Sequence, residues 1–131
     1  MITKITILKR RLPGDKSLNE ELQWLGSSLG LFNTRDKDKS CFRIFIELLK
    51  TTKQHRPISS DQLSLKLDLS RGTVVHHLHK LESSGIVITE HKGYILRVDN
   101  LKRLIDEIET DIQRACKDLK EIAERIDDKL R

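Results

Sequence analysis

Aromatic residues and cysteines are both scarce in this chain of 131 residues. Aromatic residues make up 4% of it, too few for a base-stacking platform of the kind that holds single-stranded nucleic acid. The two cysteines, Cys41 and Cys116, cannot build a disulfide scaffold, and the sequence has no C-x-x-C pair. No apolar run approaches the roughly 18–20 residues that cross a bilayer. We therefore expect a cytoplasmic protein that makes no contact with a membrane.

The residue patterns of enzymes are missing as well. The sequence has no nucleophile paired with a base, no glycine-rich phosphate loop and no metal-ligand spacing. The chain is also too short for a TIM barrel. We expect neither catalysis nor a bound cofactor or metal ion.

Positive charge is in excess and unevenly distributed. The net charge is +5, from 25 Lys and Arg against 20 Asp and Glu. Residues 1–97 hold 17 of the basic and 10 of the acidic side chains, whereas residues 98–131 hold 8 and 10. The first part is therefore strongly basic and the last part slightly acidic. A basic surface of this kind suits an acidic partner such as nucleic acid.

Apolar spacing predicts helices along most of the chain. Leu18, Leu22, Leu25 and Leu29 recur at helical intervals, and further apolar stripes follow them. The predicted helices span residues 18–31, 40–53, 60–67 and 71–84, and a strand hairpin spans 86–98. Residues 33–39 are predicted to be a charged loop.

Serine and glycine mark the ends of these elements. Ser40 and Ser70 are predicted N-caps, and Ser59 or Ser60 begins the helix between them. Gly85 stands where a left-handed residue closes a helix.

Two further segments carry basic residues. Gly93 follows His91 and Lys92 in the hairpin, and we expect it to supply a positive φ for the turn. Residues 2–12 are predicted to be either a short strand or a loose basic end. A minor-groove arm is the other interpretation of the cations in this segment, which are Lys4, Lys9, Arg10 and Arg11.

The predicted helix 71–84 has two distinct faces. At 100° per residue, Val74, Leu78 and Leu81 fall together and define a core face. The opposite side holds hydrogen-bonding groups, cations and a residue without a side chain, as a helix that enters the major groove requires. His77 lies on the shoulder of the core face and is expected to be half-buried and structural.

The stretch Leu67–Val87, which reads LDLSRGTVVHHLHKLESSGIV, resembles the recognition-helix region of ArsR-like transcriptional regulators. The resemblance covers roughly residues 40–98 and implies a winged helix-turn-helix that binds DNA as a repressor or activator, usually as a homodimer. The candidate DNA contacts on the helices and the wing are Ser59, Ser60, Ser70, Arg71, Gly72, Thr73, Val75, His76, His79, Lys80, His91 and Lys92. Nothing near His76 and His79 completes a metal shell, so no metal site is expected.

The chain from residue 100 onward contains neither glycine nor proline and carries a strict heptad pattern. A helix with such a seam must bury it, and we expect the seam to pair with a second copy of the chain. The alternative is that the helix folds back onto its own domain. The predicted dimer contacts are Leu101, Leu104, Ile105, Ile108, Ile112, Ala115, Leu119, Ile122 and Ile126.

Together these patterns predict a mainly α fold with a small β-hairpin, of the α+β class. Residues 1–35 form an N-terminal arm and helix that pack on the dimer helix, 36–98 a winged helix-turn-helix domain, and 99–131 a coiled-coil dimerisation helix. The predicted function is sequence-specific binding of double-stranded DNA by a homodimeric transcriptional regulator. The alternative is a winged-helix protein–protein interaction module of a larger assembly, with little DNA affinity.

Overall fold

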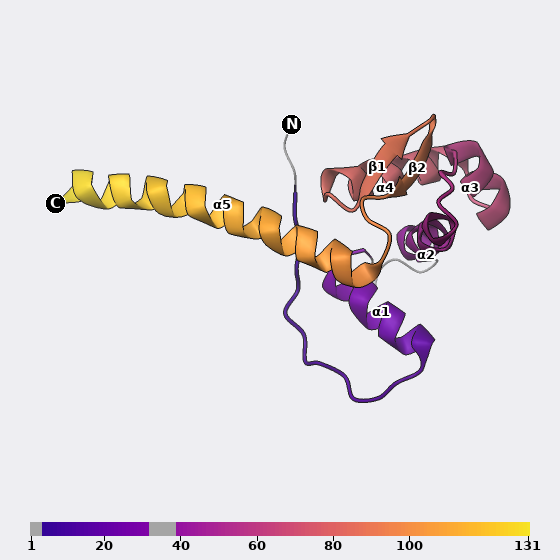
Figure 1. Ribbon diagram of the computed structural model, residues 1–131, viewed down its shortest axis with the longest axis horizontal. Helices are drawn as coiled ribbons and strands as arrows, with labels where there is room; N and C mark the ends of the chain where they lie inside the picture. Colours follow the sequence, from indigo (N-terminus) through magenta and orange to yellow (C-terminus); the bar gives the residue numbers. More distant parts are fainter. Residues whose placement is uncertain (1–3, 32–38) are drawn as a thin grey trace.

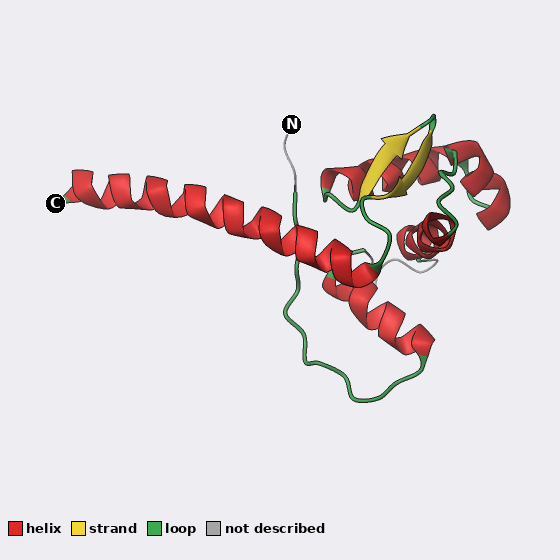
Figure 2. Ribbon diagram, in the orientation of Figure 1, coloured by secondary structure: helices red, strands yellow, loops and turns green. Residues whose placement is uncertain are grey.

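The computed structural model describes residues 4–31 and 39–131. Within these residues the chain forms five helices and one two-stranded antiparallel hairpin, which confirms the predicted mainly α fold (Figures 1 and 2). The elements are α1 (Leu18–Ser28), α2 (Ser40–Lys53), α3 (Ser60–Leu67), α4 (Arg71–Ser83), β1 (Val87–Glu90), β2 (Gly93–Leu96) and α5 (Leu101–Leu130). All but one residue of the predicted charged loop 33–39 lie outside the described residues.

Helix α2 lies at the centre of the core. Its Ile44, Phe45 and Leu48 side chains are fully buried, because α4 and β2 cover its apolar face. Leu63 of α3 completes this core from the other side. Burial of each such side chain contributes roughly 1.5–3 kcal/mol, so the packing around α2 holds the three helices and the hairpin in one unit.

The hairpin is extended by a segment that sequence spacing did not reveal. β1 and β2 pair from Val87 opposite Leu96 to Glu90 opposite Gly93. Ile58 then bridges to Tyr94 on the free side of β2, with N–H to O distances of 3.0 and 2.8 Å in the two directions. The chain between α2 and α3 therefore joins the hairpin through one isolated bridge and fixes it against the helices.

Most predicted helix ends are confirmed. The Ser59 hydroxyl accepts from the backbone N–H of Gln62 at 3.1 Å, and the Gln62 side chain accepts from the Ser59 N–H, which is a complete capping box. Ser70 caps α4 through the N–H of Thr73 at 3.1 Å. Gly85 adopts a φ of 78° just after α4, as its position predicted.

Three end predictions are wrong. The first helix was predicted to reach residue 31, whereas α1 ends at Ser28 and Gly30 turns the chain with a φ of 72°. Ser40 is the first residue of α2 and is buried, whereas the N-cap is Lys39, which is left-handed and makes no side-chain cap. Gly93 does not supply a positive φ, because His91 and Lys92 adopt φ values of 47° and 63° and form the turn themselves. Gly93 is glycine for a different reason: a Cβ there would lie 2.9 Å from the Cβ of Pro57.

The described part of the N-terminal segment is neither a strand nor loose. Residues 4–14 have no regular secondary structure, so the predicted short strand does not form. The N–H of Lys4 donates to the carbonyl of Ser83 at 2.7 Å, and the N–H of Leu8 donates to that of Ser28 at 2.7 Å. This segment therefore connects the ends of α1 and α4.

Helix α5 begins against the core and then leaves it (Figure 1). Leu104 and Ile108 are buried within their own chain, and Leu101 and Ile112 pack beside them. Every residue from 113 to the end is exposed. The first turns of the predicted dimer helix are thus anchored to their own domain, and the distal turns have no neighbour within the described chain.

Candidate nucleic-acid interface

The turn between α3 and α4 is tightly bonded. Asp68 closes α3 in the left-handed conformation, with a φ of 54°. The N–H of Leu69 donates to the carbonyl of Ser64 at 3.1 Å, and the Ser64 hydroxyl donates to the carbonyl of Leu69 at 2.5 Å. These bonds hold α4 at a defined angle to α3, as a helix-turn-helix requires.

Ion pairs also fix α3 against α2. Lys66 reaches Glu47 of α2, with an N–O distance of 2.6 Å, and Glu47 is buried. Arg43 of α2 donates to the Leu67 carbonyl at 2.6 Å and satisfies the end of α3. No sequence pattern marked these residues, because their partners lie on different helices.

The inner face of α4 is the predicted one. Val74, Leu78 and Leu81 have no solvent exposure, so the orientation of the helix about its axis is fixed by the core. His77 is half-buried at the edge of this face, as its angular position predicted, and its ring lies edge-on to that of His76.

The outer face of α4 is open to solvent. Arg71, His76, His79 and Lys80 are exposed, and a Cβ placed on Gly72 would meet nothing within 4 Å. This combination leaves the first turns of the helix without bulk and places donors and cations beside them. The remaining candidates on this face, Thr73 and Val75, are half-buried.

Arg71 has an exposed partner at the start of α3. Its Nε lies 3.3 Å from an oxygen of Asp61, and both side chains are about two-thirds exposed or more. An ion pair this open contributes little to stability, since water screens it. The guanidinium can therefore exchange this carboxylate for another anion without cost to the fold.

Two of the three candidate serines, Ser59 and Ser70, serve as helix caps. Ser59 and Ser60 lie half-buried at the start of α3, and the Ser59 hydroxyl is used by its own helix. Ser70 caps α4 and also donates to the Thr73 hydroxyl at 2.8 Å. The hydroxyl groups of Ser59 and Ser70 are thus bonded to their own helix ends, beside the backbone N–H groups that favour an anion.

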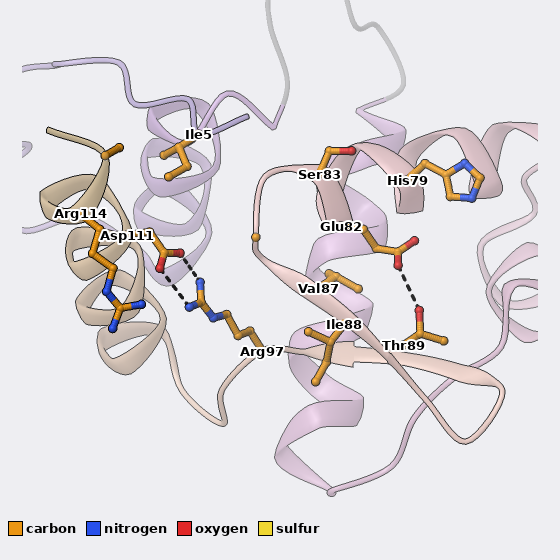
Figure 3. Close-up of a pocket in the computed structure, with 12 residues that line it drawn as sticks. Ile5, His79, Glu82, Ser83, Val87, Ile88, Thr89, Arg97, Asp111 and Arg114 are labelled. Carbon is orange, nitrogen blue, oxygen red and sulfur yellow. Dashed lines mark hydrogen bonds and ion pairs between the residues drawn. The ribbon is translucent and has the colours of Figure 1, made fainter. Parts of the chain in front are cut away.

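The hairpin tip presents two exposed side chains. His91 and Lys92 occupy both central positions of the turn and project to solvent. The Thr89 hydroxyl donates to the Glu82 carboxylate at 3.0 Å, which ties β1 to α4 (Figure 3). The tip is thereby held at a set distance from the exposed face of α4.

A groove lies between the end of α4, β1 and α5, with a volume of about 760 Å³. Arg97 crosses from the hairpin to α5 and donates to both oxygens of Asp111, at 2.5 and 3.2 Å (Figure 3). The bond from Arg97 holds the pKa of Asp111 below its usual value, and the bond to Asp111 raises the pKa of Arg97. Glu107 joins the same guanidinium at 3.2 Å. No sequence pattern marked this link, which couples the hairpin to α5.

Among residues 4–31 and 39–131, no three His, Cys, Asp or Glu side chains gather closely enough to hold a metal ion. None of the helices in those same ranges is long and apolar enough to cross a membrane.

Comparison with known families identifies the central segment. Residues 45–95 match the family model described as an HTH domain. The match runs from the middle of α2 through α3, α4 and β1 into β2, which is the part of the molecule that builds the open face of α4. Neither the curated proteins nor the solved structures gave a match to the chain. The segment 45–95 is thus similar to an HTH domain in sequence, and the bonded turn between α3 and α4 has the geometry of a helix-turn-helix.

Proposed function

We propose that the protein is a homodimeric transcriptional regulator of the ArsR-like kind that binds double-stranded DNA sequence-specifically. The observation that carries the proposal is the open first half of α4. Arg71, Gly72 and His76 face solvent there, while the opposite side of the same helix is fully buried. In this arrangement α4 enters the major groove, and His91 and Lys92 of the wing rest on the flanking backbone or minor groove.

The charge distribution supports this assignment. Residues 1–97 carry 17 basic against 10 acidic side chains, and the exposed face of α4 adds no acidic group between Arg71 and Lys80. Cations on this part of the molecule favour a phosphate backbone and give salt-dependent affinity. The HTH match to residues 45–95 points to the same partner.

The exposed distal part of α5 supports a homodimer. Leu119, Ile122 and Ile126 are about half exposed or more, and they share one side of the helix. Large apolar side chains in a row on a soluble helix mark an interaction surface. The same proposal divides the chain into three parts, which are residues 1–35, the winged domain 36–98 and the dimer helix 99–131.

Selection of preferred sequences from a random DNA pool, read at two salt concentrations, tests the function. A regulator enriches one motif, and the motif survives the higher salt while bulk binding is lost. Uniformly weak binding with no preferred sequence contradicts the proposal. Capture of a different protein chain, together with salt-insensitive and negligible DNA binding, identifies an interaction module instead.

The double variant Arg71→Ala/His76→Ala tests the face of α4. We expect the site preference to disappear while the dimer and the helical content stay unchanged, because both side chains are exposed and outside the core. Lys117→Ala is the control, since it removes one cation from the exposed part of α5. Loss of folding in the double variant would show that the contact face is misassigned.

A further inference from the structure

We propose that two copies of the chain pair through α5 in antiparallel orientation, with the two winged domains at opposite ends of the helix pair. The inference rests on the proposed homodimer and adds its polarity and register. The surface concerned is the α5 stripe, defined as Ile112, Ala115, Leu119, Ile122 and Ile126.

The α5 stripe has no covering element in the described chain beyond its first residue. Leu119 is 68% exposed, Ile122 48% and Ile126 50%, whereas Ile112 still packs beside the core. Cys116 and Ala123 border the stripe and are small, so a second helix can approach closely along this side. The surface has the width and the residue sizes of a helix–helix contact.

A parallel pair is blocked near the start of α5. In a parallel pair in register, Leu101, Ile105 and Ile108 would face their own copies at the same height. Ile108 is 3% exposed and Leu101 also packs on the core, so both domains would have to lie against the helix pair at the same height. Of these three residues only Ile105 is exposed, at 37%.

An antiparallel pair avoids this conflict because the two domains lie at opposite ends of the pair, and only the bare distal turns of the second helix run beside the first turns of α5. When Ala115 packs opposite Leu119 of the second copy, Ile112 packs opposite Ile122 of that copy. The two-fold symmetry of the pair repeats each of these contacts once. Ile126 then reaches the level of Ile108, beside Ile105, which is 37% exposed. This register covers every member of the α5 stripe.

The flanking charges favour the same polarity. In this register Asp111, which binds Arg97 in its own chain, also faces Arg125 of the second copy, which pairs with Glu121 in its own helix. This intermolecular contact occurs twice. The register also brings Asp118 of one chain near Asp118 of the second copy. Both side chains are exposed there, so water screens their repulsion. In a parallel pair Asp118 would face Ala123 and Arg125 would face Leu130, so neither charge would gain a partner.

Distance measurement between spin labels separates the two polarities. A label at Lys102, whose side chain is 86% exposed, is introduced as Lys102→Cys together with Cys116→Ser, and the buried Cys41 stays unlabelled. At 1.5 Å per residue, the antiparallel register separates the two labelled backbones by roughly 45 Å. A parallel pair would bring them within roughly 20 Å.

Cross-linking of the native chain tests the register. The antiparallel register sets Cys116 beside Cys116 of the second copy on one flank, and Cys116 is exposed. We expect bismaleimidoethane to convert most of the protein to a covalent dimer, and Cys116→Ser to abolish the product. A shift of one heptad would move the two sulfur atoms about 10 Å apart along the axis and leave the reaction inefficient.

A charge reversal supplies an independent readout in solution. Arg125→Glu should raise the dimer dissociation constant roughly three- to tenfold, because it turns two attractive contacts with Asp111 into repulsive ones. The matched control Lys117→Glu makes the same change of charge on the outer side of α5 and should leave the constant unchanged.

The outcomes distinguish this inference from the proposed function. A dimer with the long label distance and an efficient cross-link supports it, and a dimer with a short distance overturns the polarity alone. A chain that stays monomeric by light scattering overturns both the polarity and the homodimer. DNA selection is measured separately, so a monomer that enriches a motif would retain the DNA-binding part of the proposal.

Discussion

The guanidinium of Arg97 donates to both carboxylate oxygens of Asp111, at 2.5 and 3.2 Å, and so joins the end of the hairpin to α5. The two side chains are 26% and 23% exposed, which protects the pair from much of the screening that surface pairs suffer. The hairpin and the proposed dimer helix are therefore connected by a directional contact as well as by the chain.

Asp111→Asn should lower the free energy of unfolding at neutral pH by about 1 kcal/mol, or a few degrees in Tm, because it removes the charge that Arg97 binds. Asp106→Asn, which breaks an exposed pair with Lys102, should change stability by less than half as much. Thermal unfolding of both variants checks this, and equal losses would show that the Arg97 contact is no stronger than a surface pair.

The same pair should make stability depend on pH in a defined direction. The folded-state pKa of Asp111 is lowered from 3.8, so its contribution is fully present above pH 3.8 and is lost as pH falls through the folded-state pKa. The Tm difference between the native chain and Asp111→Asn should therefore be constant near neutrality and shrink toward zero in acid. A difference that grows in acid would contradict the assignment.

Leu78→Ala and Leu65→Ala make the same chemical change at opposite extremes of burial. Leu78 of α4 is fully buried, and its truncation should cost about 2–5 kcal/mol in urea unfolding. Leu65 of α3 is 85% exposed, so its truncation should stay within about 0.5 kcal/mol. A large loss of unfolding free energy in Leu65→Ala would contradict this, and would mean that a second copy of the chain covers α3.

Two glycine substitutions should change the free energy of unfolding in opposite directions. Gly72→Ala should raise the free energy of unfolding by up to about 1 kcal/mol, because its site is open and alanine favours a helix. Gly93→Ala should lower it, because the added Cβ meets Pro57 at 2.9 Å and the backbone of Ile58 at 3.1 Å. Under the proposed function, Gly72→Ala also weakens DNA binding while it stabilises the free protein. Chemical denaturation and anisotropy on the selected site measure the two effects.

Lys92→Ala tests the wing as a backbone contact. If its ammonium neutralises one phosphate, affinity should fall equally for preferred and random DNA, and the slope of log affinity against log salt should decrease by about 1. Anisotropy titrations over a series of salt concentrations measure this slope. A change in sequence preference instead would place Lys92 against a base edge.

The accuracy of the helix predictions has a local cause. The ends of α3 and α4 were predictable because Ser59, Ser70 and Gly85 act through bonds to residues a few positions away. Ser40 failed because its environment is set by the core rather than by the neighbouring turn. Gly93 failed because its requirement comes from Pro57, which is distant in sequence and close in space.

For the candidate site, the buried face of α4 was predictable from the sequence, whereas the contacts between elements were not. The periodicity of residues 71–84 alone defines which side of α4 is buried, because a regular helix fixes the angle between residues. Arg71–Asp61 and Glu82–Thr89 could not be foreseen, since no periodic rule relates the elements that they join.

Residue spacing along the chain was enough to predict the order of elements, the buried face of α4 and the apolar stripe of α5, because each depends on spacing within one regular element. Packing between elements set the bridge from Ile58 to Tyr94 and the contact of Arg97 with Asp111. It also set the point along α5, after Ile112, where the helix leaves the core. These depend on distances between segments that are remote along the chain, and packing of the core around α2 sets those distances.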